Sequence, residues 1–131
     1  MIVLDCSYTL AMVMPDEARP QSLWAVMDAR LFAPAIWPVE VANALRNGIR
    51  RGRLVESEVQ AVCAQVEAFE VETSPSSDLG VRHRYLAAHA HDLTAYDAAY
   101  LELALQRRCA LATLDNQLAA AARRAGVAVL D

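Results

Sequence analysis

The sequence predicts an α/β fold, in which a parallel sheet has helices on both of its faces. Short apolar segments alternate along the chain with longer segments whose apolar residues recur at helical spacing, and this alternation is typical of such sheets. The 131 residues are the size of one domain, so we expect a single domain over residues 1–131. Because 56% of the residues are apolar, we also expect a partner or a second copy to cover part of the surface.

The expected strands are short and apolar. The first ends in an acidic residue, Asp5, and Pro34 closes the second. Their ranges are Ile2–Asp5, Leu31–Ala33, Val71–Thr73, Ala110–Leu114 and Val127–Leu130. A loop is expected over residues 74–77, where Ser and Pro gather after the third strand.

Prolines and a glycine bound the helices of the first half of the chain. Pro15 stops the first helix, Pro20 suits the first turn of the second, and Gly52 ends the third. The first two helices end near Met14 and Ala29, and the next two span Pro38–Arg51 and Ser57–Phe69.

Capping residues and a glycine mark the helices of the second half. The three expected helices extend from Asp78 to about His89, over Ala95–Arg107 behind the cap Thr94, and over Asn116–Arg124 before Gly126.

Composition excludes several classes of protein. All twelve basic residues are Arg, which excludes a P-loop, a Schiff-base enzyme and a phosphoacceptor signalling domain, because each needs a lysine. The four glycines form no phosphate-binding cluster, and the three cysteines and three histidines lack metal-site spacing. No basic start marks a signal peptide and no apolar run is long enough to span a membrane. We therefore expect a cytoplasmic protein without a membrane partner.

Four acidic residues lie where a parallel sheet binds ligands. Asp5 and Asp115 end the first and fourth expected strands, while Glu40 and Asp97 lie near the starts of two helices. Carboxylates gathered in one cleft repel each other unless a cation intervenes. Mg²⁺ prefers oxygen ligands and bridges carboxylates to phosphate. The four acids therefore predict a magnesium site that acts on a phosphodiester.

Each acid also has a purely structural interpretation. Asp97 fits a capping box, Asp115 fits an N-cap, and Glu40 fits a solvated helix position. Asp5 fits such an interpretation least, because a charge directly after a buried strand is costly. The net charge of −4 is unusual for a protein that binds nucleic acid, but four acids clustered around a metal would leave the remaining surface nearly balanced.

With these residues the chain resembles the PIN-domain nucleases, and in particular the VapC-type toxins of bacterial toxin–antitoxin pairs. The resemblance covers the whole chain, and the motifs keep their order and spacing. They are residues 2–7 (Ile-Val-Leu-Asp-Cys-Ser), 38–45 (Pro-Val-Glu-Val-Ala-Asn-Ala-Leu), 93–104 (Leu-Thr-Ala-Tyr-Asp-Ala-Ala-Tyr-Leu-Glu-Leu-Ala) and 111–118 (Leu-Ala-Thr-Leu-Asp-Asn-Gln-Leu).

The resemblance implies a Rossmann-like sheet and a Mg²⁺-dependent endoribonuclease, with Mn²⁺ as a substitute for Mg²⁺. It also implies a homodimer and a small antitoxin that blocks the cleft. The residues that it assigns to catalysis and metal binding are Asp5, Glu40, Asp97 and Asp115. Ser7 and Thr113 match supporting hydroxyls.

Substrate contacts are expected along the helix that carries Glu40. The residues that suit a track for RNA phosphates are Arg46, Asn47, Arg50, Arg51 and Arg53; a solvated basic helix end is the alternative. Four aromatic residues are expected either to stack on RNA bases or to pack in the core or an interface. They are Tyr8, Trp24, Trp37 and Tyr85.

The alternative function is a non-catalytic PIN-like binding module. A phosphatase with an aspartate nucleophile is disfavoured because Ser7 stands where its second Asp belongs.

Overall fold

The computed structural model describes residues 1–75 and 79–131. It has one parallel sheet of five strands, in the order β3-β2-β1-β4-β5. The strands are β1 (Ile2–Leu4), β2 (Leu31–Ala33), β3 (Glu72–Thr73), β4 (Ala110–Ala112) and β5 (Val129–Leu130). The helices of the described residues are α1 (Cys6–Val13), α2 (Leu23–Met27), α3 (Trp37–Arg50), α4 (Glu56–Glu67), α5 (Val81–His91), α6 (Ala95–Arg107) and α7 (Asn116–Arg124).

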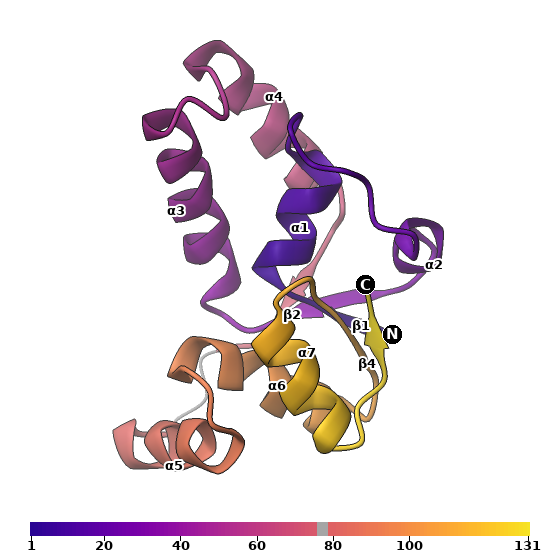
Figure 1. The fold of residues 1–131 in the computed structure, drawn as a ribbon, viewed down its shortest axis with the longest axis vertical. Helices are drawn as coiled ribbons and strands as arrows, with labels where there is room; N and C mark the ends of the chain where they lie inside the picture. The colour runs from indigo at the N-terminus through magenta and orange to yellow at the C-terminus, as the bar shows by residue number, and fades with distance from the viewer. Residues whose placement is uncertain (76–78) are drawn as a thin grey trace.

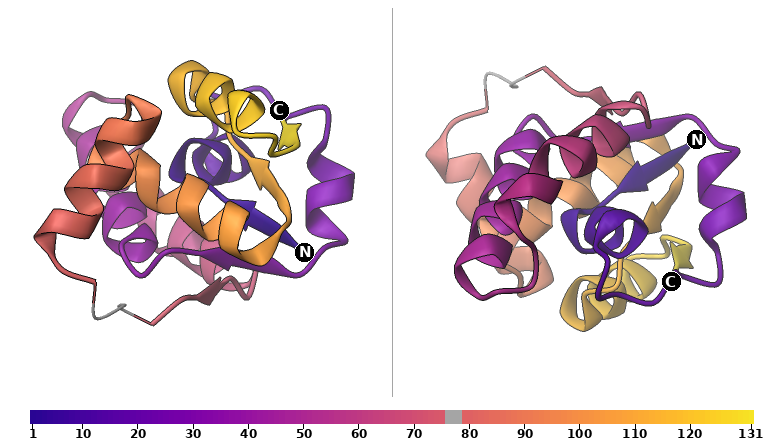
Figure 2. Two further views of the ribbon diagram at one scale, coloured as in Figure 1. Left: turned by 90° about the horizontal axis from the view of Figure 1, so that it is seen from below. Right: turned by 90° about the horizontal axis from the view of Figure 1, so that it is seen from above.

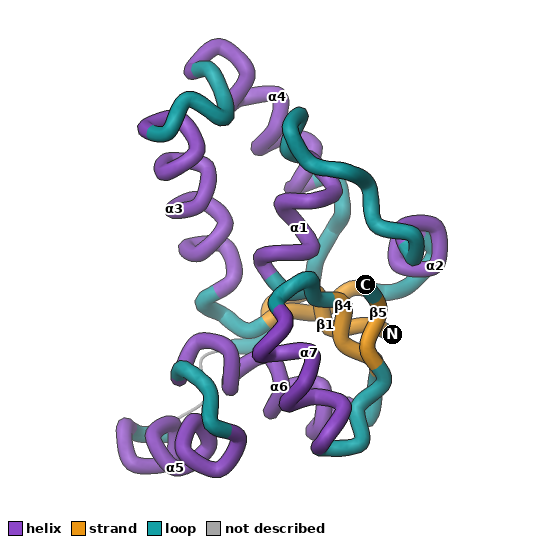
Figure 3. The backbone as a smooth tube through the Cα atoms, viewed as in Figure 1, coloured by secondary structure: helices purple, strands orange, loops and turns teal. Residues whose placement is uncertain are grey.

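Helices cover both faces of the sheet. Figure 1 shows the strands across the middle of the molecule, with α1, α3 and α4 above them and α6 and α7 below. In Figure 2, the view from below has α6 and α7 in front of the sheet, and the view from above has α1, α3 and α4 in front. In Figure 3 the strands form a narrow band between the two groups of helices. The predicted α/β fold class is therefore confirmed.

The central strands are buried on both faces because helices cover both. Val3, Leu4, Leu111 and Ala112 have no exposed surface, which explains why β1 and β4 are continuously apolar. The edge strand β3 is exposed instead, and its Glu72 forms an ion pair of 2.7 Å with Arg30.

The strand order reverses between β1 and β4. β2 lies on one side of β1 and β4 on the other, with Leu4 paired to Ala112. The Asp5 amide extends this pairing, since it donates to the Ala112 carbonyl at 3.0 Å. Parallel α/β sheets bind ligands at such a reversal, beyond the carboxyl ends of the strands. Residues that follow β1 and β4 therefore share one edge of the sheet.

Most expected boundaries differ from the structure by one to three residues, and three of the differences concern β4, α2 and α5. β4 ends at Ala112 instead of Leu114, because the Thr113 hydroxyl accepts a hydrogen bond from the Asp115 amide and turns the chain. α2 begins three residues after Pro20, and the Ser22 hydroxyl at its start contacts Tyr8 instead of capping it.

The third difference concerns α5, which begins at Val81 with Gly80 at its N-cap. The expected cap Asp78 and half of the expected loop 74–77 lie outside the described residues. Among the helices that are described, none has the length and apolar character needed to cross a membrane.

Candidate active site

A cleft of about 300 Å³ opens beyond the carboxyl ends of β1 and β4. The four predicted acids all line it, and each comes from a different part of the fold. Asp5 follows β1, Glu40 and Asp97 lie in the first turns of α3 and α6, and Asp115 precedes α7. The remaining lining residues are Cys6, Ser7, Asn43, Ala44 and Asn47.

Asp5 is the most enclosed of the four acids, with 5% of its surface exposed. Its Oδ1 accepts a hydrogen bond from the Cys6 amide at 2.7 Å. Its Oδ2 accepts from the hydroxyls of Ser7 at 2.6 Å and Thr113 at 2.8 Å. Burial raises the pKa of Asp5, while these hydrogen bonds oppose the rise because they favour the charged form.

The two predicted supporting hydroxyls therefore contact the first acid directly. They also approach each other, at 3.3 Å. Ser7 Oγ accepts from the Leu114 amide at 3.0 Å, and Thr113 Oγ1 accepts from the Asp115 amide at 3.1 Å. This small network connects the segment after β1 to the segment after β4.

Glu40 is held by a residue that the sequence analysis did not single out. The Tyr100 hydroxyl, on α6, donates to Glu40 Oε2, on α3. Burial and the Glu40 carboxylate raise the pKa of Tyr100, so that its hydroxyl stays protonated and acts as the donor. Burial and the charges of Asp5 and Asp97 raise the pKa of Glu40, and the bond from Tyr100 opposes that rise.

Asp115 has the N-cap contact that its position predicted, and the amide of Asp97 has one of the two contacts of the expected capping box. The Thr94 hydroxyl accepts from the Asp97 amide at 3.1 Å, and Asp115 Oδ1 accepts from the Leu118 amide at 2.8 Å. Burial raises the pKa of Asp97, with further contributions from the charges of Asp115 and Asp5. The capping and site interpretations are thus compatible, because both side chains also line the cleft.

The cleft concentrates negative charge. Burial and mutual repulsion raise the pKa values of Glu40 and Asp97, and burial that of Asp5, which is the environment that a cation relieves. In the part of the chain that the structure describes, no three acidic, cysteine or histidine side chains form a ready-made metal-binding group. The carboxylates of Asp5, Glu40 and Asp115 instead accept hydrogen bonds from protein groups.

The predicted substrate-binding residues divide into two groups. Asn47 lines the cleft, and so does Asn43, which sequence reasoning missed. Asn43 and Asn47 follow Glu40 by three and seven positions and share one face of the helix with it, so the spacing that indicated Asn47 could have identified Asn43 as well. The Arg residues of the predicted phosphate track are exposed outside the cleft lining, and their contact with RNA stays a prediction; they are Arg46, Arg50 and Arg51.

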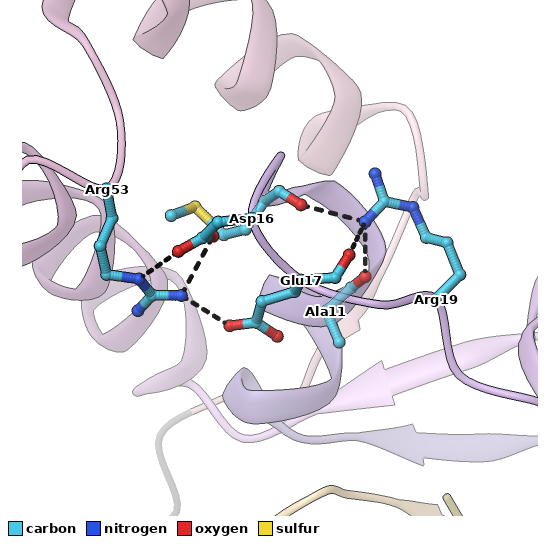
Figure 4. A network of polar contacts seen from close by, with 6 residues as sticks. Ala11, Asp16, Glu17, Arg19 and Arg53 are labelled. Atoms are coloured by element: carbon cyan, nitrogen blue, oxygen red, sulfur yellow. Dashed lines mark hydrogen bonds and ion pairs between the residues drawn. The ribbon is translucent and has the colours of Figure 1, made fainter.

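Arg53, the last residue of the predicted track, has other partners. Figure 4 shows its guanidinium between two acids of the loop after α1. It contacts Asp16 at 2.7 Å and Glu17 at 2.8 Å. These ion pairs join this loop to the turn after α3 and engage the charge of Arg53, while its expected contact with phosphate stays a prediction. Arg19 orders the same loop through the carbonyls of Ala11, Met14 and Glu17.

Other predicted side chains lie away from the chemistry. Tyr8 and Trp37 are buried in the core, so the expectation that they pack there is confirmed and the alternative, stacking on RNA bases, is wrong. Trp24 and Tyr85 are exposed, and stacking on them stays a prediction. Cys6 borders the cleft, where burial and the charges of Asp5 and Glu40 raise the pKa of its thiol to about 12. The thiol is therefore protonated and a poor nucleophile at neutral pH.

A second hollow, of about 600 Å³, lies along α5 and the start of α6. It is larger than the acidic cleft, but its lining includes one acidic residue, Asp92. The smaller cleft is the better candidate active site, because titratable groups with raised pKa values converge there.

The sequence also matches known proteins. The model of the PIN domain family matches residues 2–124. Ribonuclease VapC3 of Pyrobaculum aerophilum is 35% identical over 120 residues, which are 90% of this chain and 92% of the relative. The VapC ribonuclease Mb0985 of Mycobacterium bovis is 33% identical over 118 residues, 90% of this chain and 88% of its own length.

Two crystal structures share the fold. PAE2754 from Pyrobaculum aerophilum superposes with a TM-score of 0.73 at 21% identity, covering 98% of this chain and 89% of that one. FitAcB from Neisseria gonorrhoeae superposes with a TM-score of 0.62 at 22% identity, covering 100% and 97%. From the family match and the relatives above 30% identity, this chain belongs to the PIN-domain family, as a member of the VapC type.

Proposed function

We propose that this chain is a divalent-metal-dependent endoribonuclease and the toxin of a toxin–antitoxin pair. The observation that carries the proposal is the convergence of four carboxylates, from four parts of the fold, on one cleft at the reversal of a parallel sheet. The relatives named VapC ribonucleases, which align over about 90% of this chain, support RNA as the substrate.

The acidic cleft fits a hard cation such as Mg²⁺. Its donor set is made of carboxylate and amide oxygens, which Mg²⁺ and Mn²⁺ accept as ligands. Asp5, Glu40 and Asp97 would hold the ion, with Asp115 bound directly or through water. When bound, the ion would offset the clustered negative charge and stabilise the charge that develops on the scissile phosphate.

The chain's own residues would orient both the acids and the substrate. The hydroxyls of Ser7 and Thr113 favour the ionised form of Asp5, the form that binds a cation. The amides of Asn43 and Asn47 border the cleft from α3 and would hydrogen-bond to RNA phosphate or ribose. Arg46, Arg50 and Arg51 would attract the backbone beyond the cleft.

The proposal includes two protein partners, an antitoxin that blocks the cleft and a second copy of the chain, and a cytoplasmic location with the RNA. The homodimer is supported by α5, which has no buried residue and exposes Val81, Tyr85 and Leu86. A monomeric mass in light scattering would contradict the dimer. Failure of the cleavage-inactive protein to retain a co-expressed antitoxin candidate would count against that partner.

The direct test is cleavage of total cellular RNA by the purified protein with Mg²⁺ or with EDTA. We expect discrete fragments with Mg²⁺ and none with EDTA. The cleavage rate of Asp5→Asn should be at least about 100-fold lower than that of the wild type, because a group of the metal site loses its charge. Asp28→Asn is the matched control, since Asp28 is an exposed residue at the end of α2, and it should cleave as the wild type does. Equal cleavage with EDTA would contradict the metal dependence. No cleavage by the folded protein would favour the non-catalytic binding module.

A further inference from the structure

Tyr100 connects two helices, α6 and α3, that each carry an acid of the cleft. It has no exposed surface and lies three residues after Asp97 on α6, so both side chains are on the same side of that helix. Its hydroxyl donates to Glu40 Oε2 on α3, across 60 residues of sequence. A buried phenol needs a partner, and here that partner is an acid of the cleft.

The contact fixes a side chain that would otherwise turn away. Glu40 has three rotatable side-chain bonds and faces the negative charges of Asp5 and Asp97, so that repulsion favours rotamers that point out of the cleft. A hydrogen bond to one carboxylate oxygen opposes this rotation and leaves Oε1 to act as a ligand. Mutation of a residue that hydrogen-bonds to a metal ligand commonly weakens metal binding by about 10–100-fold.

We propose that Tyr100 is a positioning residue, whose hydroxyl holds the Glu40 carboxylate in the orientation that binds a divalent cation in the cleft. The inference rests on the proposed function, because it requires a cation site. It adds a residue that needs no contact with the metal or the RNA. It also explains why a phenol, with its polar end, is buried at this position of an otherwise apolar helix face.

The test is the affinity of the RNA-free protein for Mn²⁺, measured by isothermal titration calorimetry. Tyr100→Phe removes the hydroxyl and keeps the ring, and we expect about 10-fold weaker Mn²⁺ binding. Tyr8→Phe is the matched control. Tyr8 is also fully buried, and its hydroxyl bonds to Ser22 at 2.7 Å, away from the cleft. Both variants should lose some stability to urea, but Tyr8→Phe should bind Mn²⁺ as the wild type does.

A double-mutant cycle separates positioning from a general loosening of the fold. If Tyr100 acts through Glu40, adding Tyr100→Phe to Glu40→Gln should weaken Mn²⁺ binding no further than Glu40→Gln alone. The proposal is overturned if Tyr100→Phe binds Mn²⁺ like the wild type, or if both tyrosine variants weaken binding equally. A wild-type protein that binds no Mn²⁺ would overturn both this inference and the proposed metal dependence, whereas wild-type binding with an unaffected Tyr100→Phe would overturn the inference alone.

Discussion

Thr113 shows how one buried hydroxyl can organise an acidic site. It has no exposed surface, donates to Asp5 Oδ2 at 2.8 Å and accepts from the Asp115 amide at 3.1 Å. The first bond favours the ionised form of Asp5, and the second sets the turn that carries Asp115 to the cleft. A threonine here therefore influences two of the four acids without being an acid itself.

Thr113→Val keeps the shape of the side chain and removes the hydroxyl. We expect the free energy of unfolding to fall by about 1–3 kcal/mol, because a buried carboxylate and a backbone amide each lose a partner. Urea unfolding measures the change. Thr73→Val, at an exposed position of β3, should stay within about 0.5 kcal/mol of the wild type. Equal stability of the two variants would show that the Thr113 hydroxyl makes no net contribution.

At the scale of elements, α7 depends on a residue that also belongs to the site. Asp115 is its N-cap and accepts from the Leu118 amide, an amide that would otherwise lack a partner at the helix start. Asn caps a helix about as well as Asp, whereas Ala does not cap. Substitution by Asn and by Ala can therefore separate the capping role from the role of the charge.

We expect Asp115→Ala to lose about 1 kcal/mol of unfolding free energy and Asp115→Asn to lose much less. Both variants should cleave RNA more slowly than the wild type, and by similar factors, because both remove the charge. Thermal unfolding and cleavage rates are measured on the same preparations. Full activity of Asp115→Asn would mean that Asp115 serves the helix and not the reaction.

Local patterns predicted the elements but not all of their limits. Apolar runs located all five strands within two residues, and the caps Thr94 and Asp115 located the starts of α6 and α7. The end of β4 depends on the hydroxyl network of Thr113, and the start of α2 on a contact of Ser22 with Tyr8. Thr113 also donates to Asp5, 108 positions away, and Ser22 lies 14 positions from Tyr8, so spacing along one segment could not show these contacts.

Local patterns also predicted the acids of the site, but not the contacts between residues far apart in the sequence. The positions of the four acids followed from strand ends and helix starts, and all four line the cleft. The contact between Tyr100 and Glu40 joins residues 60 positions apart, and it depends on how the fold places the start of α3 relative to α6. Asn43 lies between these cases, because its i, i+3 spacing from Glu40 is a local signal.

For the whole molecule, the acids of the cleft lower the free energy of unfolding by an amount that depends on pH. The pKa values of Asp5, Glu40 and Asp97 are raised in the folded chain above the ordinary values of 3.8 for Asp and 4.5 for Glu. Over the pH range between the ordinary and the raised values, the folded state binds more protons than the unfolded state, so stability falls as pH rises. Asp16 acts in the opposite sense, because its bond to Arg53 lowers its pKa, but its side chain is exposed, so this effect is weak.

In EDTA, we therefore expect these three carboxyls to lower the free energy of unfolding as pH increases above about 4. Asp5→Asn removes the most buried contributor and should be less sensitive to pH, since each unit of pKa shift corresponds to about 1.4 kcal/mol. Because Mg²⁺ binds the ionised carboxylates of the folded state, it should stabilise the wild type more at neutral than at acidic pH. Urea unfolding of both proteins across this range, with EDTA and with Mg²⁺, measures these effects. If Asp5→Asn followed the same pH profile as the wild type, and Mg²⁺ left both unchanged, the carboxylates would not be coupled to a cation as proposed.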